Sequence, residues 1–415
     1  MGSLQTFIKR LGPGILFASM AIGTSHLVLS TKAGATYGWI MVIPILLANL
    51  FKYPFFEFGI RFTNITKKSL LEGYLDKGKG YLWVYTLATI MSALTILAAL
   101  YTVTAGLLIR LFPLLGDHML EVTFGLFAFI TAVLIIGRYY FLEQSLKIIV
   151  LLLFMALFVT TIMVIYKGPA PMVADFEAPS FLNEAGILFL ISLMGWMPTA
   201  VEASSWVSLW SIEKLKINKE ETLTEALSEF KFGYILTAVL SLFFLVIGWL
   251  TLFGTGNEMS GSSVVFADQL ITLFTQHIGD WAYFFIALAA FATMFSSCMT
   301  AHDALARISV DTVKFLFLNR RTPKKSLLTI FFIVHMIVSF SVVYFFGANM
   351  GFLVALATFV SFMMAPGIGL LNHSLVIDKK IPAELRPSKG LQFLSYAGFV
   401  FLSLFALYYF YQLLF

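Results

Sequence analysis

Charged residues and cysteine are scarce in this chain. Only 12% of its 415 residues are Asp, Glu, Lys or Arg and 60% are hydrophobic, whereas soluble domains are about 45–50% apolar. The single cysteine, Cys298, excludes a disulfide framework and a cysteine-based metal cluster. The sequence also lacks a phosphate-binding loop, a nucleophile–base pair and a metal-hydrolase motif. These absences exclude an enzyme and ATP-driven transport by this chain alone, and we expect no cofactor.

Long apolar runs take up most of the sequence. Windows of about 20 apolar residues predict transmembrane helices. Eleven such helices are expected, at 12–34, 38–60, 81–112, 119–137, 145–166, 184–211, 230–254, 279–306, 326–346, 349–373 and 391–414. We therefore expect an all-α integral membrane protein whose residues 1–415 form a single transmembrane domain.

The basic residues indicate how the chain is oriented in the membrane. Most of its 27 Lys and Arg residues fall in loops on one side of the expected helices. Because basic loops stay in the cytoplasm, we expect a protein of the cytoplasmic membrane with a cytoplasmic N-terminus. After an odd number of spans the C-terminus is external. This topology accounts for the net charge of +5 without a nucleic-acid partner.

Two of the expected helices are interrupted near their middle. In the span 12–34, the tetrapeptide at 23–26 (Gly-Thr-Ser-His) is polar and poor in helix formers. In the span 184–211, Pro198 lacks an N–H group and interrupts the helix. Backbone groups freed at membrane depth must face protein or a water-lined cavity, so a broken helix there indicates a binding site.

One interrupted helix in each half of the chain is typical of inverted-repeat secondary transporters. We expect repeats at about 12–166 and 184–373 and an extra helix at 391–414, with alternating access around a site between the two breaks. The expected substrate-binding residues are Gly23, Thr24, Ser25, His26, Met194, Met197, Thr199 and Glu202.

Ionisable side chains at membrane depth cost about 2.5–3.5 kcal/mol on insertion scales, so each is a functional candidate. His26 follows the first break. Its imidazole either coordinates a cation or relays a proton, or it bonds a backbone carbonyl and stabilises the break. Glu202 lies about one turn into the second half-helix, whose positive end favours the ionised carboxylate. It faces either the cavity or a neighbouring helix.

The coupling-ion candidates lie outside the two breaks. Lys52 and Glu57 are five residues apart across Pro54, which fits an ion pair where proline bends the helix. Alternatively, Lys52 points at the cavity and its ammonium occupies the space of a coupling cation. Clustered hydroxyl groups of the kind that Na⁺ binds are offered by Ser296, Ser297 and Thr300.

Two motifs resemble the NRAMP divalent-metal transporter family. They are Gly-Pro-Gly at 12–14, eight residues before the tetrapeptide at 23–26, and Met-Pro at 197–198. The order of the spans extends the resemblance over most of the chain. It implies a LeuT-type fold of two inverted five-helix repeats, with the substrate held between the unwound first and sixth helices. It also implies proton-coupled uptake of Mn²⁺ or Fe²⁺.

The metal-ligand positions of that family are filled differently in this chain. The family tetrapeptide is Asp-Pro-Gly-Asn, whose Asp and Asn bind the metal, and its sixth helix carries Met-Pro-His. Here Gly23 and His26 stand at the Asp and Asn positions, Met197 is retained and Thr199 replaces the histidine. The resemblance therefore implies His26 and Met197 as metal ligands. A divalent cation of the Mn, Fe or Mg class needs charged or multiple oxygen ligands, so it is the substrate that the family implies and not one that these residues indicate.

Two alternatives remain open from the sequence. The segment 195–206 is similar to the sixth helix of transporters of the amino acid–polyamine–organocation group, where an aromatic residue precedes the break and a glutamate follows it. Freed N–H groups at Gly23, Thr24 and Ser25 would receive a substrate carboxylate. One alternative is thus an H⁺- or Na⁺-coupled transporter of an amino acid or other small polar organic solute. The other is a transport-inactive membrane sensor.

Overall fold

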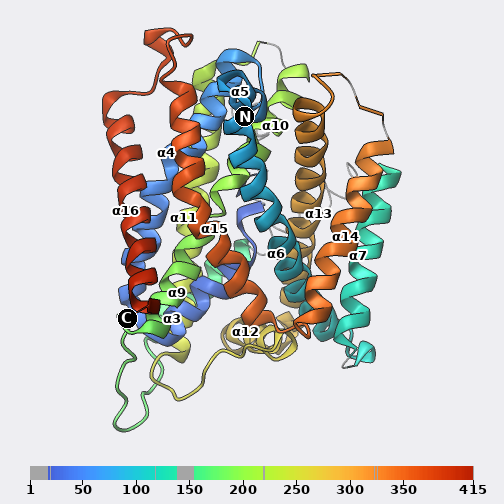
Figure 1. Ribbon diagram of the computed structural model, residues 1–415. Coiled ribbons are helices and arrows are strands. Elements are labelled where there is room, and N and C mark those ends of the chain that lie inside the picture. The colour runs from blue at the N-terminus through green and yellow to red at the C-terminus, as the bar shows by residue number, and fades with distance from the viewer. Residues whose placement is uncertain are drawn as a thin grey trace, which may run out of the picture.

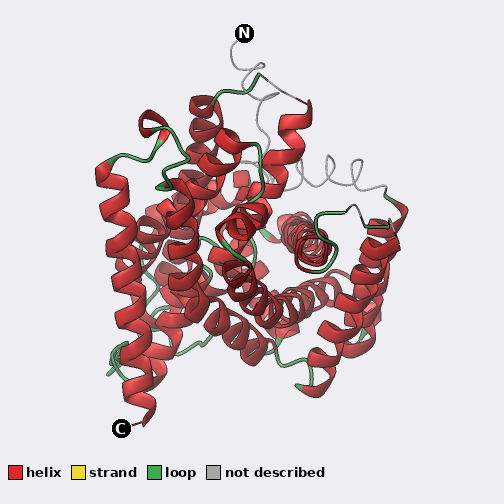
Figure 2. Ribbon diagram, turned by 45° about the horizontal axis from the view of Figure 1, so that its top comes forward, coloured by secondary structure: helices red, strands yellow, loops and turns green. Residues whose placement is uncertain are grey.

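The computed structural model describes residues 17–18, 20–116, 118–137, 154–217, 220–321, 323–324 and 326–414. Every regular element in this part of the chain is a helix, as Figure 2 shows. Eight of these helices are long and apolar enough to cross a membrane. The expected all-α membrane fold is confirmed.

Each expected span coincides with one helix or with two successive half-helices. The unbroken spans are α4 (Val42–Thr66), α6 (Lys79–Leu111), α7 (Met119–Ile136), α11 (Leu223–Leu252), α13 (Tyr283–Leu316), α14 (Ser326–Phe345), α15 (Met350–Val376) and α16 (Lys389–Leu414). The described part of the span at 145–166 is the helix Phe154–Lys167. The connections contain α5 (Leu70–Lys77), α12 (Ser263–Ile278), η2 (Gly38–Met41), η3 (Pro113–Leu115), η5 (Asp280–Ala282) and η6 (Ala383–Leu385).

Side-chain caps determine where several helices begin. Asn183 caps α9 (Glu184–Gly195) by accepting a hydrogen bond of 2.8 Å from the N–H group three residues later. Asn349 caps α15 in the same way, at 3.0 Å. Thr222 and Glu225 form a reciprocal capping box at the start of α11. Each cap satisfies N–H groups that have no partner within the helix, so the polar residues between the apolar runs set the boundaries.

The first interrupted helix breaks at the start of the expected tetrapeptide. The described residues of its first half, 17, 18, 20 and 21, are helical, and a π-helical turn, η1 (Ser25–Ser30), leads into α3 (Thr31–Tyr37). The helix is interrupted at Ile22 and Gly23. A Cβ atom at Gly23 would lie 3.0 Å from the Ser297 hydroxyl oxygen on α13. Glycine therefore lets the broken segment approach α13 closely.

The second interrupted helix breaks around the expected proline. The half-helix α9 ends at Gly195, and α10 (Ser204–Ile217) follows the irregular residues 196–200 and a 3₁₀ turn, η4 (Val201–Ala203). Pro198 has no N–H group to continue the helix. The last carbonyl groups of α9 thus lose their helical partners.

The two interrupted helices run through the middle of the bundle (Figure 1). There, η1 and α9 contact each other, α11 packs against η1, and α4 and α15 pack against α9. In Figure 1, α16 lies along one outer edge, and α7 and α14 form the opposite edge. The helix α12 lies across one end of the bundle, and α5 and α10 lie towards the other end. The two breaks are thus enclosed by long helices on several sides.

Candidate functional site

A small cavity lies between the two helix breaks. Its volume is about 30 Å³, which is room for roughly two water molecules. The lining residues come from both breaks and from α6, α10 and α13: Met20, Ala21, Gly23, Thr24, Ser25, Ile96, Leu100, Trp196, Thr199, Ala200, Trp206, Ser297 and Ala301. The structure therefore has a small cavity between the first and sixth spans.

Hydroxyl groups are among the polar side-chain groups of the residues that line this cavity. They belong to Thr24, Ser25, Thr199 and Ser297. The Ser25 oxygen lies 2.9 Å from the carbonyl of its own helix at Ala21, and Ser297 donates to the Thr293 carbonyl at 3.1 Å. The lone pairs of these hydroxyls remain available to a ligand. Among the described lining residues none is charged.

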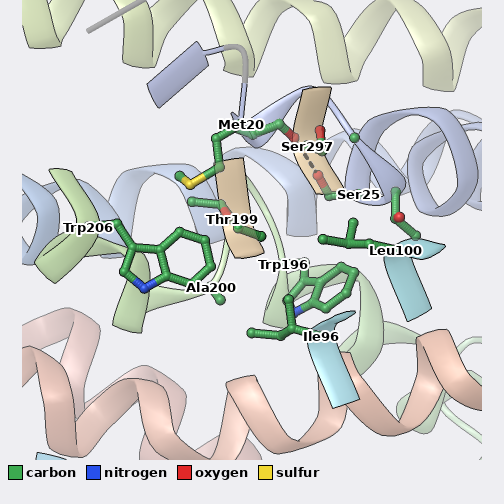
Figure 3. Close-up of a pocket in the computed structure, with 13 residues that line it drawn as sticks. Met20, Ser25, Ile96, Leu100, Trp196, Thr199, Ala200, Trp206 and Ser297 are labelled. Atoms are coloured by element: carbon green, nitrogen blue, oxygen red, sulfur yellow. Dashed lines mark hydrogen bonds between the residues drawn. The ribbon is translucent and has the colours of Figure 1, made fainter. Parts of the chain in front are cut away.

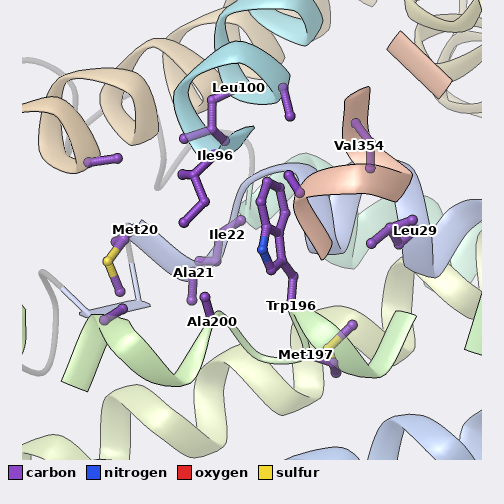
Figure 4. Close-up of a cluster of buried hydrophobic side chains, with 14 of the residues drawn as sticks. Met20, Ala21, Ile22, Leu29, Ile96, Leu100, Trp196, Met197, Ala200 and Val354 are labelled. Carbon is purple, nitrogen blue, oxygen red and sulfur yellow. The ribbon is translucent and has the colours of Figure 1, made fainter. Parts of the chain in front are cut away.

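Apolar and aromatic side chains form the rest of the cavity wall. Ile96 and Leu100 lie one turn apart on α6, and Figure 3 shows Trp196 and Trp206 around Thr199 and Ala200. Trp196 is held by a hydrogen bond of 3.0 Å from its ring nitrogen to a hydroxyl on α15. In Figure 4 its ring and the Met197 side chain point to opposite sides of the break. The wall thus combines rigid rings with small side chains.

His26 is directed at α11 and does not line the cavity. Its Nε2 atom lies 3.0 Å from the Thr237 carbonyl oxygen, and its Nδ1 atom lies 2.8 Å from the Ser25 hydroxyl oxygen. Because a carbonyl only accepts, Nε2 carries the proton of the neutral ring. The ring is fully buried. His26 therefore ties the first break to α11. This contact is the bond to a backbone carbonyl that was one of the two roles considered for His26 from the sequence.

The two methionines expected in the site do not reach the cavity either. Met194 and Met197 are buried at the end of α9 and in the second break, outside the cavity lining. The thioether that lines the cavity belongs to Met20, in the first half-helix. In Figure 3 it lies on the same side of the cavity as Trp206.

Glu202 is held behind the cavity wall. It is fully buried, and its Oε1 atom accepts a hydrogen bond of 2.9 Å from Ser361 on α15. The same Ser361 oxygen accepts the bond from the Trp196 ring. Ser92 on α6 lies beside the carboxylate. Glu202 thus faces neighbouring helices and is joined to the cavity wall through one serine.

Lys52 binds the end of α9. Its ammonium donates to the carbonyl oxygens of Met194 at 2.5 Å, Gly195 at 2.7 Å and Thr199 at 3.4 Å. The side chain is fully buried, and the Glu202 charge acts on it at longer range.

The expected ion pair between Lys52 and Glu57 is wrong. Glu57 pairs instead with Arg61, four residues later, at 2.5 Å. The reason is that α4 continues as a helix through Pro54, so a spacing of five residues puts Lys52 and Glu57 on different faces.

Of the expected sodium-binding hydroxyls, the structure brings only Ser297 to the cavity. Thr300 donates to the carbonyl of Ser296 at 2.6 Å, within α13. Both Ser296 and Thr300 are buried outside the described cavity lining. The three side chains therefore do not converge on one point in the cavity.

Several lining residues were not among the expected site residues. Met20 precedes the first break by less than one turn, and Trp196 directly precedes Met197. Ile96 and Leu100 have the i,i+4 spacing of one helix face. Their side chains are apolar, so nothing in the sequence distinguished them from packing residues.

The ligand atoms of the site are of types that bind small cations, but none of the described lining residues brings a negative charge. Hydroxyl and carbonyl oxygens are the ligands of hard cations, and one thioether adds a soft donor. Within the described ranges no three His, Cys, Asp or Glu side chains come together around a point. Lys52 and Glu202 lie outside the described lining, and the charge of each acts on the other.

Comparisons with known proteins agree with this architecture. The sequence model of the natural resistance-associated macrophage protein-like family (Nramp) matches residues 14–412. An uncharacterized protein of Pasteurella multocida (strain Pm70) is 34% identical over 405 residues, which cover 96% of this chain and 90% of that protein.

Solved structures share the fold at low identity. A manganese transporter of Eremococcus coleocola superposes with a TM-score of 0.70 at 13% identity, covering 97% of this chain and 86% of that one. MhsT in complex with L-phenylalanine gives a TM-score of 0.66 at 14% identity, and the match covers 97% of this chain and 98% of the MhsT chain. The match of the family model over nearly the whole chain and the 34% identical relative establish that this protein, a membrane transporter with the LeuT-type fold, belongs to the Nramp family.

Proposed function

We propose that this protein carries a small cation across the membrane by alternating access, with the cavity between the two helix breaks as its central site. The observation that supports this most directly is the size of the cavity. At about 30 Å³ it accommodates an ion with one or two waters and is too small for an amino acid. The hydroxyls of Thr24, Ser25, Thr199 and Ser297 would be its oxygen ligands.

The family suggests a divalent metal, of the Mn, Fe or Mg class, as that cation. Its member from Eremococcus coleocola is named a manganese transporter. In this chain the Met20 thioether would be the one soft ligand. Because the described lining offers no carboxylate, a divalent ion would have to keep part of its hydration shell, as Mg²⁺ does in most sites. Coupling to H⁺ or Na⁺ would supply the driving force.

The orientation that we propose follows from the basic loops. With the N-terminus in the cytoplasm, α5 and α10 lie at the cytoplasmic end of the bundle and α12 at the external end. The cavity is then roughly midway, as expected for a transporter whose breaks form the site. The cytoplasmic membrane is the proposed location.

A small polar organic solute is the second candidate. The observation that favours it is the pair of tryptophan rings, Trp196 and Trp206, in a cavity without an acidic ligand among its described residues. MhsT, which has the same fold, was crystallised with L-phenylalanine. Such a substrate requires the cavity to expand when it binds.

Filling the cavity should stop transport. We expect Ser297→Leu to slow the initial rate of substrate uptake into proteoliposomes by at least about fivefold, because overpacking costs about 1–3 kcal/mol and each 1.4 kcal/mol is a factor of ten in affinity. Uptake is measured in parallel for Mn²⁺, Mg²⁺, Na⁺ and a set of amino acids, with and without a proton gradient.

The matched control is Ser341→Leu, which changes a half-buried serine on α14, outside the described cavity lining, and leaves uptake unchanged. Cation uptake that Ser297→Leu does not reduce would contradict the proposed site. Uptake of an amino acid alone would favour the second candidate, and no uptake of any solute would favour a membrane sensor.

Placing the aspartate of the family tetrapeptide at position 23, in the first break, should increase metal affinity. A Cβ at Gly23 points at the Ser297 oxygen, 3.0 Å away, so aspartate fits there once that hydroxyl is removed. We expect Gly23→Asp/Ser297→Ala to bind Mn²⁺ at least about tenfold more tightly than the unmodified protein, because a buried carboxylate offsets the cost of desolvating the ion. The affinity is measured by titration calorimetry.

The neutral counterpart Gly23→Asn/Ser297→Ala has nearly the same shape and no added charge. It should not gain affinity for Mn²⁺. Equal affinities of the two double variants would mean that the side chain at position 23 does not face the ion.

A further inference from the structure

Lys52 has the surroundings of a bound cation. An ammonium group has three N–H donors, and those of Lys52 lie near three carbonyl oxygens, at 2.5, 2.7 and 3.4 Å. The carbonyls belong to Met194, Gly195 and Thr199, and the side chain has no exposed surface. All of its donors are thus directed at backbone oxygens of the second break.

The carbonyls of Met194 and Gly195 belong to the last turn of α9, and that of Thr199 lies beyond the end of the helix. The Met194 oxygen also accepts a backbone bond of 3.4 Å from the N–H group of Met197. The last carbonyl groups of a helix have no partner within it, and they carry the negative end of its dipole. In broken-helix transporters, unwound carbonyls and the C-terminal ends of half-helices are the groups that coordinate a coupling cation. Lys52 therefore occupies a place whose chemistry fits a free monovalent cation.

The charge of a buried acid acts on this cation. The acid is Glu202, which is fully buried in the turn η4 that follows the break. Ser361 links Glu202 to Trp196 through bonds of 2.9 and 3.0 Å. Thr199 and Trp196 both line the cavity. Lys52 therefore holds one part of the cavity wall through the Thr199 carbonyl, and Glu202 holds another through Ser361 and Trp196.

We propose that Lys52 is a tethered cation that fills a monovalent-cation site at the end of α9, so that this transporter binds no separate coupling cation there. It turns the carbonyl oxygens of the second break away from the cavity and towards α4. The ligand class of the site, once the lysine is removed, is a free monovalent cation of ammonium size. The role as a coupling element rests on the proposed transport function, whereas the cation site itself does not.

The test is rescue of the truncated side chain by a free cation. Purified full-length Lys52→Ala is heated in detergent in choline chloride, in ammonium chloride or in methylammonium chloride. We expect a lowered midpoint of thermal unfolding in choline, and a saturable upward shift in ammonium or methylammonium. The unfolding midpoint of the unmodified protein should be the same in all three salts. The same is expected of Lys389→Ala, which changes an exposed lysine.

A second variant covers the case in which Lys52→Ala does not fold in choline. Lys52→Ala/Glu202→Gln removes both buried charges and keeps the three carbonyls. It should fold in choline and show the same ammonium-dependent shift with at least tenfold weaker affinity. Folded protein of either variant that is indifferent to ammonium and methylammonium would overturn the proposal. Because no transported substrate is present, this result is independent of the uptake measured with Ser297→Leu.

Discussion

Replacing Lys52 with methionine should lower the free energy of unfolding by roughly 3–5 kcal/mol, because three buried carbonyl oxygens lose a charged donor, at about 1–3 kcal/mol each, and the buried Glu202 loses a cation whose charge acts on it. Methionine is close to lysine in length and fills the space of the methylene chain. The loss therefore comes from the charge and from the three carbonyl oxygens that lose their donor. Glu202 has no route to solvent, since its side chain is fully buried.

The double variant Lys52→Met/Glu202→Gln separates charge from packing. It should recover at least half of the stability that Lys52→Met loses, because no unbalanced charge remains. Unfolding is followed in detergent for the two single variants, the double variant and the unmodified protein. A Lys52→Met variant as stable as the unmodified protein would contradict this account, and so would a double variant no more stable than Lys52→Met.

A side chain at Gly34 should prevent normal assembly of the bundle. A Cβ atom there would lie 2.0 Å from the Leu245 carbonyl oxygen on α11, and one at Gly248 would lie 2.1 Å from the Thr31 oxygen on α3. Both obstacles are backbone atoms, so the helices themselves would have to separate. We expect Gly34→Leu to cost at least about 3 kcal/mol, the upper end for overpacking, and to yield little folded protein on size-exclusion chromatography.

The control is Gly125→Ala on α7, where an added Cβ meets no atom within 4 Å. This change should alter stability by no more than about 1 kcal/mol, in the stabilising direction, because alanine favours the helix. The contact between α3 and α11 matters for the site, since α3 continues the half-helix that follows the first break. Gly34→Leu protein with normal yield and elution would show that the two helices do not pack through these glycines.

The sequence predicted the spans and breaks because their signals are local. An apolar run of membrane length and a proline without an N–H group act on their own segment, whatever the rest of the chain does. The helix α9 and the break at residues 196–200 could therefore be placed before the structure was known.

The direction of individual side chains within the breaks could not be predicted. Helical periodicity assigns a residue to a face, but it fails where the backbone is irregular. Met197 therefore points away from the cavity, and Met20, on the regular half-helix, reaches it. Lys52 needed a partner at membrane depth, and its three carbonyls lie more than 140 residues further along the chain. Only the tertiary fold identifies such a partner.

The most direct test of the proposed site is titration calorimetry of the purified, folded protein with Mn²⁺, followed by Mg²⁺. If the cavity between the two breaks takes a divalent cation, the unmodified protein binds one of the two ions and Ser297→Leu binds neither. Ser341→Leu should bind as the unmodified protein does. Absence of binding in the unmodified protein, or equal binding in Ser297→Leu, would contradict the account.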